Sequence, residues 1–191
     1  MKGKKKIVAI SGSTKKDSSN ITILKFIEES YQELLEVDIF DDIDQLPHFN
    51  PDLDNANAPT IIKDFRNQIQ SADGVIICTP EYVFSLPGSL KNALEWNVST
   101  TIFSNKPVVI IVAAASGEKA MESLELIMTT IEFRIAKNSK LLIKGVKGKI
   151  GMNGEIKDRD TAEKIKALVE SLIYSMEEEN QQPTKYSSYG G

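Results

Sequence analysis

Five short segments of the chain are rich in apolar residues, most of them β-branched. Short apolar runs of this kind are typical of parallel strands that are covered on both faces of a sheet. The third segment stops beside Pro80, which cannot donate to a strand ladder, so the strand is expected to end there. The predicted strands are residues 6–10, 37–40, 74–78, 107–113 and 141–146.

Between these segments the apolar residues recur every three or four positions, which is the spacing of one helix face. The first helix is expected to turn Leu34 inward, and the long helix after the fourth strand is expected to turn Ile135 inward. Ser89 is expected to cap a short helix, and Asp160 or Thr161 to cap the last one, which ends at Met176. The other predicted helices are residues 21–36, 60–71 and 118–136.

Strands that alternate with helices predict a parallel sheet with right-handed crossover connections. We therefore expect an α/β fold, a three-layer doubly wound sandwich whose five-stranded parallel sheet has the flavodoxin-like order 2-1-3-4-5. No change of composition marks a linker, so residues 1–178 are expected to form one domain. Residues 179–191 are polar and are expected to form a disordered tail.

Composition narrows the classes of function. The 23 basic and 27 acidic residues give a net charge of −4, which argues against nucleic-acid binding. No run of about 18 apolar residues is present, so no membrane span is expected. Cys78 is the only cysteine, which excludes a disulfide within the chain and favours a reducing, cytoplasmic location. His48 is the only histidine and is expected in a surface loop rather than in a metal or catalytic site.

The loop after the first strand combines hydroxyl groups, a lysine and the start of a helix. These groups suit a phosphate, because helix N–H groups and the helix dipole favour negative charge. The loop contains neither a Walker A motif nor Gly-x-Gly-x-x-Gly. Taken alone, its composition fits a polar turn with a helix cap better than a ligand site. The candidate phosphate-binding residues are Ser11, Ser13, Lys15, Ser18, Ser19 and Asn20.

The loop after the third strand lies at the same edge of the sheet, where open α/β folds bind ligands. It offers aromatic side chains and backbone N–H groups beside an apolar strand, which suits a flat heteroaromatic ring. Two alternatives stay open, since Tyr82 and Phe84 can pack in the core and Glu81 can order the loop through a hydrogen bond. The candidate residues are Pro80, Glu81, Tyr82, Val83, Phe84 and Ser85.

The stretch from Thr79 to Trp96 resembles the NAD(P)H-dependent FMN reductases, a flavodoxin-like family that includes quinone, azo and metal-oxyanion reductases. The family pattern is Thr-Pro-Glu-Tyr, two variable residues, Ser, one variable residue and Pro-Gly, then Leu-Lys-Asn-Ala and an acidic residue before Trp. Every fixed position of this pattern is present. The variable pair, often Asn-Gly in the family, is Val83-Phe84 in this chain.

Residues 12–20 are similar to a second motif of the family, Gly-Ser-x-Arg-x-x-Ser-x-Asn. Lys15 takes the place of the Arg, which keeps the charge but loses bidentate geometry. Asp17 stands where Gly is frequent and adds a negative charge. The glycine-rich loop that borders the flavin in the family has only a weak counterpart here, Ser116 and Gly117.

The resemblance implies an enzyme with FMN as cofactor and NAD(P)H as co-substrate. A hydride would pass from the nicotinamide to FMN and then, in a ping-pong cycle, to free flavin, a quinone, an azo compound or a metal oxyanion. The resemblance also implies that the first loop holds the phosphate of FMN, that Pro80 to Ser85 run along the flavin ring, and that Ser116 and Gly117 border this ring. No residue is assigned a catalytic role, because the flavin carries the chemistry.

The family is commonly dimeric or tetrameric. A homodimer or homotetramer is therefore expected, with the helix that starts at Glu118 as a candidate contact surface. The alternative function is a flavodoxin-like electron carrier or flavin-binding sensor that does not turn over NAD(P)H. The flavin-binding residues are the same in both cases and do not separate these functions.

Overall fold

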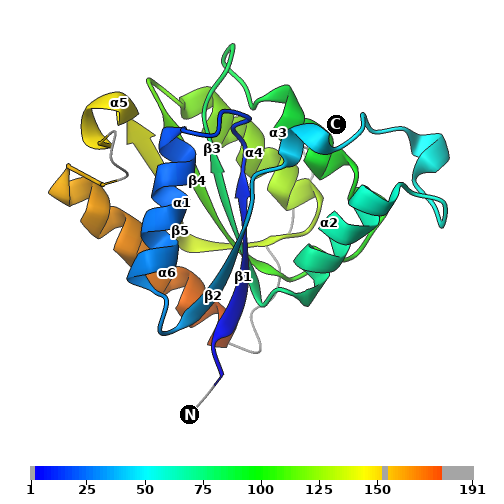
Figure 1. The fold of residues 1–191 in the computed structure, drawn as a ribbon, viewed down its shortest axis with the longest axis horizontal. Coiled ribbons are helices and arrows are strands. Elements are labelled where there is room, and N and C mark those ends of the chain that lie inside the picture. Colours follow the sequence, from blue (N-terminus) through cyan, green and yellow to red (C-terminus); the bar gives the residue numbers. More distant parts are fainter. Residues whose placement is uncertain (1–2, 152–154, 178–191) are drawn as a thin grey trace, which may run out of the picture.

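The computed structural model describes residues 3–151 and 155–177, without the side chains of residues 135–137. Five parallel strands form one sheet through the middle of the molecule, in the order β2-β1-β3-β4-β5 (Figure 1). This confirms the predicted α/β fold and strand order. The predicted tail, residues 179–191, lies outside the described residues. The strands are β1 (Lys5–Ser11), β2 (Leu35–Phe40), β3 (Gly74–Thr79), β4 (Pro107–Ala114) and β5 (Arg134–Lys144).

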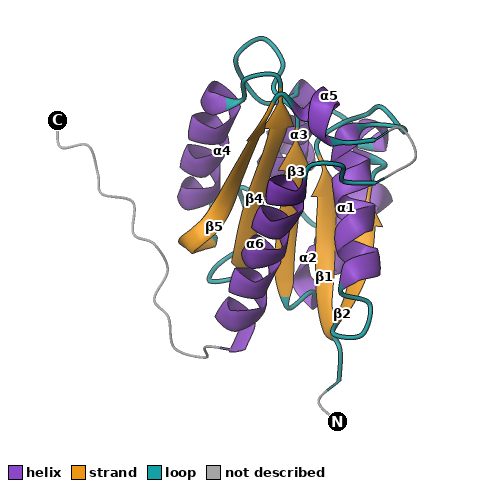
Figure 2. Ribbon diagram, turned by 90° about the vertical axis from the view of Figure 1, so that its left-hand side faces the viewer, coloured by secondary structure: helices purple, strands orange, loops and turns teal. Residues whose placement is uncertain are grey.

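Helices cover both faces of the sheet and divide the core into two halves (Figure 2). One face is covered by α1 (Ser19–Ser30), α5 (Val146–Lys149) and α6 (Arg159–Glu177). The other face is covered by α2 (Thr60–Ser71), α3 (Gly88–Glu95) and α4 (Glu118–Thr130). Two short 3-10 helices, η1 (Ile43–Gln45) and η2 (Pro51–Leu53), lie in the loop that follows β2.

The central strands are buried on both faces, which explains their continuous apolar sequences. In β1, Ile7 and Ala9 pack in the core half under α1 and α6, while Val8 and Ile10 pack in the half under α2. Every residue of β3 and β4 is buried. Burying a side chain of Val, Leu or Ile size contributes about 1.5–3 kcal/mol, so the sheet is a rigid support for the loops at its ends.

The predicted first helix is too long at its C-terminal end. It stops at Ser30, and the backbone N–H groups of Leu34 and Leu35 donate to Tyr31 O, both at 2.9 Å, which closes a turn. Leu34, expected to point inward, is 58% exposed. Leu35 instead starts β2 and pairs with Lys5, so strand pairing across the sheet overrides the helical spacing of the apolar residues.

The predicted helix 118–136 and strand 141–146 are wrong at their boundaries for the same reason. The helix ends at Thr130, and β5 begins at Arg134, which pairs with Pro107 across the sheet. Ile135 therefore belongs to a strand and not to the helical stripe. At the other end, Val146 leaves β5 and begins the short helix α5.

Two predicted helix caps are also wrong. The short helix α3 begins at Gly88 after Pro87, and no side chain caps it, so Ser89 lies inside the helix. In α6 the cap comes from Asp158, whose carboxylate Oδ2 accepts from the backbone N–H of Thr161 at 2.9 Å. Asp160 pairs with Lys164 on the exposed face instead.

Several features bear on the function without forming part of the candidate site. His48 is exposed, as expected for a surface loop. Among the described residues, no group of His, Cys, Asp and Glu is arranged to hold a metal ion. In the same part of the chain, no helix is both long and apolar enough to cross a membrane.

Cys78 ties β3 to the start of α1. Its side chain is fully buried, and its Sγ donates to the side-chain oxygen of Asn20 at 3.3 Å. Burial raises the pKa of the Cys78 thiol well above its ordinary value, because the thiolate would lose its hydration. The prediction that Cys78 is a core residue is confirmed.

This burial predicts a loss of stability in alkaline solution. The thiol ionises near pH 8.5 in the unfolded chain but stays protonated in the folded one, so the free energy of unfolding falls as the pH rises above that value. Between about pH 8 and pH 10 the wild-type protein should lose about 2 kcal/mol relative to Cys78→Ala. Urea unfolding of both proteins across this range measures the difference, and parallel curves would contradict the assignment.

Candidate functional site

The loop between β1 and α1 is folded by its own hydroxyl groups. Ser11 Oγ donates to Ser13 O at 3.2 Å and accepts from the Ser13 N–H at 3.3 Å. Ser13 Oγ accepts from the Lys15 N–H at 3.3 Å, and Ser18 Oγ caps α1 by accepting from the Ile21 N–H at 3.2 Å. All three serine side chains are buried. A hydroxyl has one proton to donate: Ser11 donates its proton within the loop, whereas Ser13 and Ser18 only accept in these hydrogen bonds, so their protons remain available.

The start of α1 supplies further donors. Ser19 and Asn20 are its first two residues, and backbone N–H groups at these positions have no partner within a helix. The positive end of the helix dipole adds to them. The side chain of Asn20 is buried and its oxygen is engaged by Cys78, so its backbone is the part that a phosphate can reach most directly.

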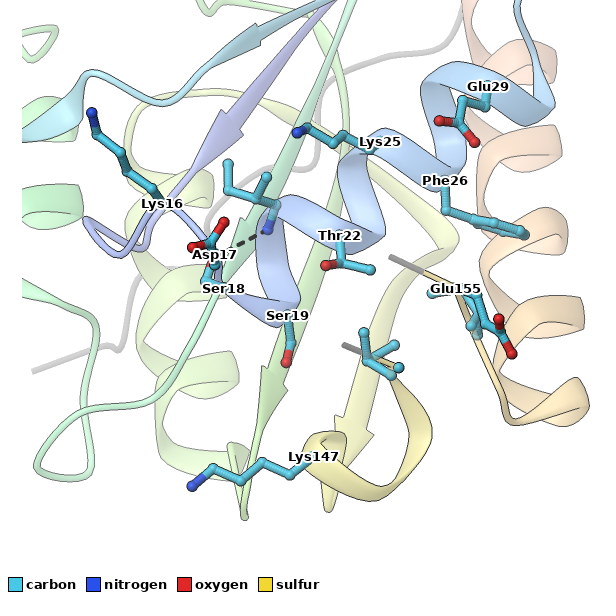
Figure 3. Close-up of a pocket in the computed structure, with 14 residues that line it drawn as sticks. Lys16, Asp17, Ser18, Ser19, Thr22, Lys25, Phe26, Glu29, Lys147 and Glu155 are labelled. Atoms are coloured by element: carbon cyan, nitrogen blue, oxygen red, sulfur yellow. Dashed lines mark hydrogen bonds between the residues drawn. The ribbon is translucent and has the colours of Figure 1, made fainter. Parts of the chain in front are cut away.

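Two hollows border this loop. Ser13 and Lys15 line a small one of about 90 Å³, whose opposite wall carries Asp41, Asp42 and Asp44. Ser18 and Ser19 line a larger one of about 970 Å³ beside α1 and α5 (Figure 3). Its three lysines are matched by three carboxylates, and the small hollow has two lysines and three aspartates, so net charge does not select either hollow as the anion site. The charged residues around the larger hollow are Lys16, Asp17, Lys25, Glu29, Lys147 and Glu155.

The first loop touches the end of β3. The backbone N–H of Gly12 donates to Cys78 O at 2.8 Å. A Cβ atom at position 12 would lie 2.3 Å from Thr79 Oγ1 and 2.7 Å from Thr79 Cβ, distances that only glycine avoids. The structure thus brings the two sequence-predicted loops, 11–20 and 80–85, together at the carboxyl edge of the sheet.

The loop after β3 is a tight hairpin. Tyr82 and Ser85 exchange two backbone hydrogen bonds of 3.0 Å, and the two residues between them, Val83 and Phe84, have φ values of 52° and 54°. Positive φ at both central residues is the mark of a type I′ turn, which favours Asn-Gly. A non-glycine residue in this region costs on the order of 1–3 kcal/mol.

The side chains of the hairpin point outward. The exposed fractions are 51% for Tyr82, 95% for Val83 and 78% for Phe84. The alternative that Tyr82 and Phe84 pack in the core is therefore wrong. Pro80 before the hairpin and Leu86 after it are buried, so its base is fixed while its tip is solvated.

Glu81 joins this loop to the one after β4. Its Oε1 accepts from the Gly117 N–H at 3.1 Å, and its Oε2 accepts from the N–H groups of Lys119 and Ala120 at 3.1 and 3.0 Å. Gly117, with φ of 100°, precedes α4 and has no side chain to cap it, so Glu81 serves as the cap. A carboxylate at a helix N-terminus is favourable. Of the two roles expected for Glu81, the hydrogen bond that orders the loop is confirmed.

A family model described as NADPH-dependent FMN reductase matches residues 5–147, which include all of these loops. The chain belongs to the NADPH-dependent FMN reductase family. It is thus an NAD(P)H-dependent oxidoreductase with FMN as its cofactor.

Named relatives agree with this assignment. This chain is 30% identical over 171 residues to a 2-hydroxy-1,4-benzoquinone reductase of Burkholderia sp., and the match covers 86% of this chain and 92% of that protein. It is 26% identical over 172 residues to a quinone reductase of Escherichia coli strain K12, with 86% and 92% covered. Among solved structures, FerB of Paracoccus denitrificans, a flavoenzyme NAD(P)H:(acceptor) oxidoreductase, matches with a TM-score of 0.80 at 26% identity, covering 91% of this chain and 97% of that one.

The residues of this FMN reductase fit the cofactor. The first loop has free hydroxyl protons at Ser13 and Ser18 beside the start of a helix, and the glycine at position 12 lets the loop lie against Thr79. Sequence analysis expected a loop-ordering hydrogen bond from Glu81 but did not predict its partners at the start of α4. The signal was present at Gly117, because a helix that starts after glycine lacks a side-chain cap of its own.

Removing the Glu81 carboxylate should lower the stability of this FMN reductase. Glu81→Ala should lower the free energy of unfolding by about 1–3 kcal/mol, since three backbone donors of α4 lose a charged acceptor. Glu81→Gln should cost less, because one amide oxygen still accepts. Chemical denaturation of the purified variants measures both.

The matched control is Glu122→Ala, which removes an exposed carboxylate that pairs with Lys119 on the surface of α4. Exposed pairs of this kind contribute at most about 1 kcal/mol. A Glu81→Ala variant that is as stable as the control would contradict the cap.

Proposed function

We propose that residues 1–178 form one catalytic domain that binds FMN across the rim of the sheet and uses NAD(P)H to reduce a small acceptor in a ping-pong cycle. The observation that carries the proposal is the contact between Gly12 and the Cys78-Thr79 end of β3. Because the two loops meet there, a single molecule with an anionic tail and a planar head can reach both. Quinones are the acceptors that the names of the relatives favour.

The first loop is assigned to the phosphate, which carries nearly two negative charges at neutral pH. Ser13 and Ser18 donate their free hydroxyl protons, Lys15 supplies a positive charge, and Ser19 and Asn20 offer backbone N–H groups. Ser11 acts by shaping the loop. Each hydrogen bond to a charged phosphate contributes about 1.5–3 kcal/mol.

The hairpin and the loop at Ser116-Gly117 are assigned to the ring. Tyr82 and Ser85 use their N–H groups within the hairpin, which leaves those of Glu81, Val83 and Phe84 to face a ligand. Glu81 holds the loop that contains Gly117 next to the hairpin, because its carboxylate accepts from the N–H of Gly117. FMN, when bound, supplies the hydride and electron transfer, and the chain supplies binding, orientation and exclusion of water.

The proposal includes a homodimer or homotetramer in the cytoplasm. Leu126 on α4 is 50% exposed, which supports the α4 surface as a subunit contact. A single buried cysteine suits a reducing compartment.

The FMN-loaded protein should lose its flavin absorbance near 450 nm within seconds of mixing with NADH or NADPH without oxygen. A quinone added afterwards should restore the absorbance, since the acceptor follows the nicotinamide in a ping-pong cycle. Stopped-flow spectroscopy of the two steps tests the enzyme against an electron carrier or sensor. Bound flavin that neither nicotinamide bleaches at saturation would reject the reductase in favour of the carrier.

The phosphate assignment predicts a difference between two ligands. Ser13→Ala combined with Lys15→Ala should weaken the binding of FMN by at least about 10-fold, because two contacts to a charged group are lost. The affinity for riboflavin, which lacks the phosphate, should change by less than about 2-fold.

Fluorescence titration with both ligands makes this comparison. Lys25→Ala, which removes a lysine from the larger hollow with its balanced charges, is the control and should affect neither ligand by more than about 2-fold. If the double variant loses affinity for FMN and riboflavin equally, the assignment of the phosphate to this loop is wrong.

A further inference from the structure

The hairpin tip combines two properties that do not favour stability. Val83 and Phe84 both have positive φ, and Val83 is β-branched, which makes the conformation less favourable still. Asn-Gly would adopt the same turn without this cost. The two side chains are also largely exposed, so burial in the chain does not compensate for the strain. Strain of this kind is retained where it serves a function.

The base of the hairpin holds the tip in one place. Pro80, Leu86 and Pro87 are buried, and Glu81 is bonded to the start of α4. In Figure 1 the loop between β3 and α3 rises beyond the carboxyl edge of the sheet, above the rim assigned to the cofactor. A rigid base below two exposed side chains is the geometry of a fixed contact surface and not of a loose loop.

The chemistry of the tip is apolar. From Tyr82 to Pro87 the chain has no charged residue. Its exposed side chains are the phenol of Tyr82, the hydroxyl of Ser85 and, at the two tip positions, the apolar groups of Val83 and Phe84. Asp41, Asp42 and Asp44 line the small hollow beside the phosphate loop, and the carboxylate of Glu81 at the base of the hairpin is turned to the backbone N–H groups of α4. A ligand that touches the tip is therefore recognised by flat apolar area and gains nothing there from a charge.

We propose that the side chains of Val83 and Phe84 determine acceptor specificity by covering the outer side of the ring site with an apolar surface. They favour a planar quinone with an apolar substituent over one with a charged substituent. This inference rests on the proposed function and deepens it, because it names the substrate class that the same site prefers.

The test compares two acceptors that share one ring system, 2-methyl-1,4-naphthoquinone and 1,4-naphthoquinone-2-sulfonate. The ratio of their kcat/KM values is measured on FMN-loaded protein, and it does not depend on how much of the enzyme is active. Val83→Asn combined with Phe84→Gly should lower the preference for the methyl quinone by about 10-fold, the scale that a lost apolar contact gives in substrate discrimination. A preference within about 2-fold of the wild-type value would overturn the proposal.

The same variant has a second readout that needs no activity. Asn-Gly relieves the strained turn, so its Tm should rise by about 2 °C or more. A Tm below that of the wild-type protein would contradict the strain at these two positions. The matched control, Val83→Ile, keeps the tip apolar, aromatic and strained, and it should keep the wild-type preference.

Three outcomes can be told apart. If Val83→Asn with Phe84→Gly dissociates into a smaller species in sedimentation while the control does not, the tip is a subunit contact and the acceptor proposal is overturned. If the wild-type protein reduces neither quinone, the proposed function fails and this inference falls with it. If the wild-type protein reduces both and only the ratio is insensitive to the tip, the proposed function stands and this inference alone is rejected.

Discussion

The close approach of Gly12 to the end of β3 is the contact on which the site depends. A hydrogen bond of 2.8 Å from Gly12 to Cys78 O holds the first loop against the strand, and Thr79 leaves no room for a Cβ atom there. Without that approach the phosphate loop and the hairpin would be two separate turns. With it they form one rim, supported by strands that are buried on both faces.

Glu81 extends this rim to a third loop. Its carboxylate accepts from three backbone donors at the start of α4, so the hairpin and the loop at Gly117 are held together. The Glu81 carboxylate already occupies the N-terminus of α4, so this helix end positions the loops and does not bind an anionic ligand. At α1, by contrast, the first backbone N–H groups remain available for an anion, as the proposed phosphate site requires.

Much of the fold follows from the sequence alone. The apolar runs predict the five strands, their alternation with helices predicts the flavodoxin-like order, and 60–71 is a helix with the predicted bounds. The errors in helix length fall at Leu34 and Ile135, where helical spacing continues past the true end of a helix. Strand pairing with Lys5 and Pro107 decides these boundaries, and pairing between distant segments is invisible to a local pattern.

For the site, too, the local sequence predicts some features, and contacts between distant segments decide others. The motif places Ser13, Lys15 and Ser18 on a loop before a helix, and the structure adds which hydroxyl protons are free. The strain at Val83 and Phe84 could not be predicted from their side chains, because neither residue favours positive φ. It follows from the hairpin between Tyr82 and Ser85, which the tertiary structure imposes.

A crystal structure of the protein with FMN tests the central claim most directly. The account predicts that the phosphate contacts the loop around Ser13, Lys15 and Ser18, and that the ring of the same molecule lies against residues 80–85. A phosphate held elsewhere, or a ring that does not touch the hairpin, would contradict it.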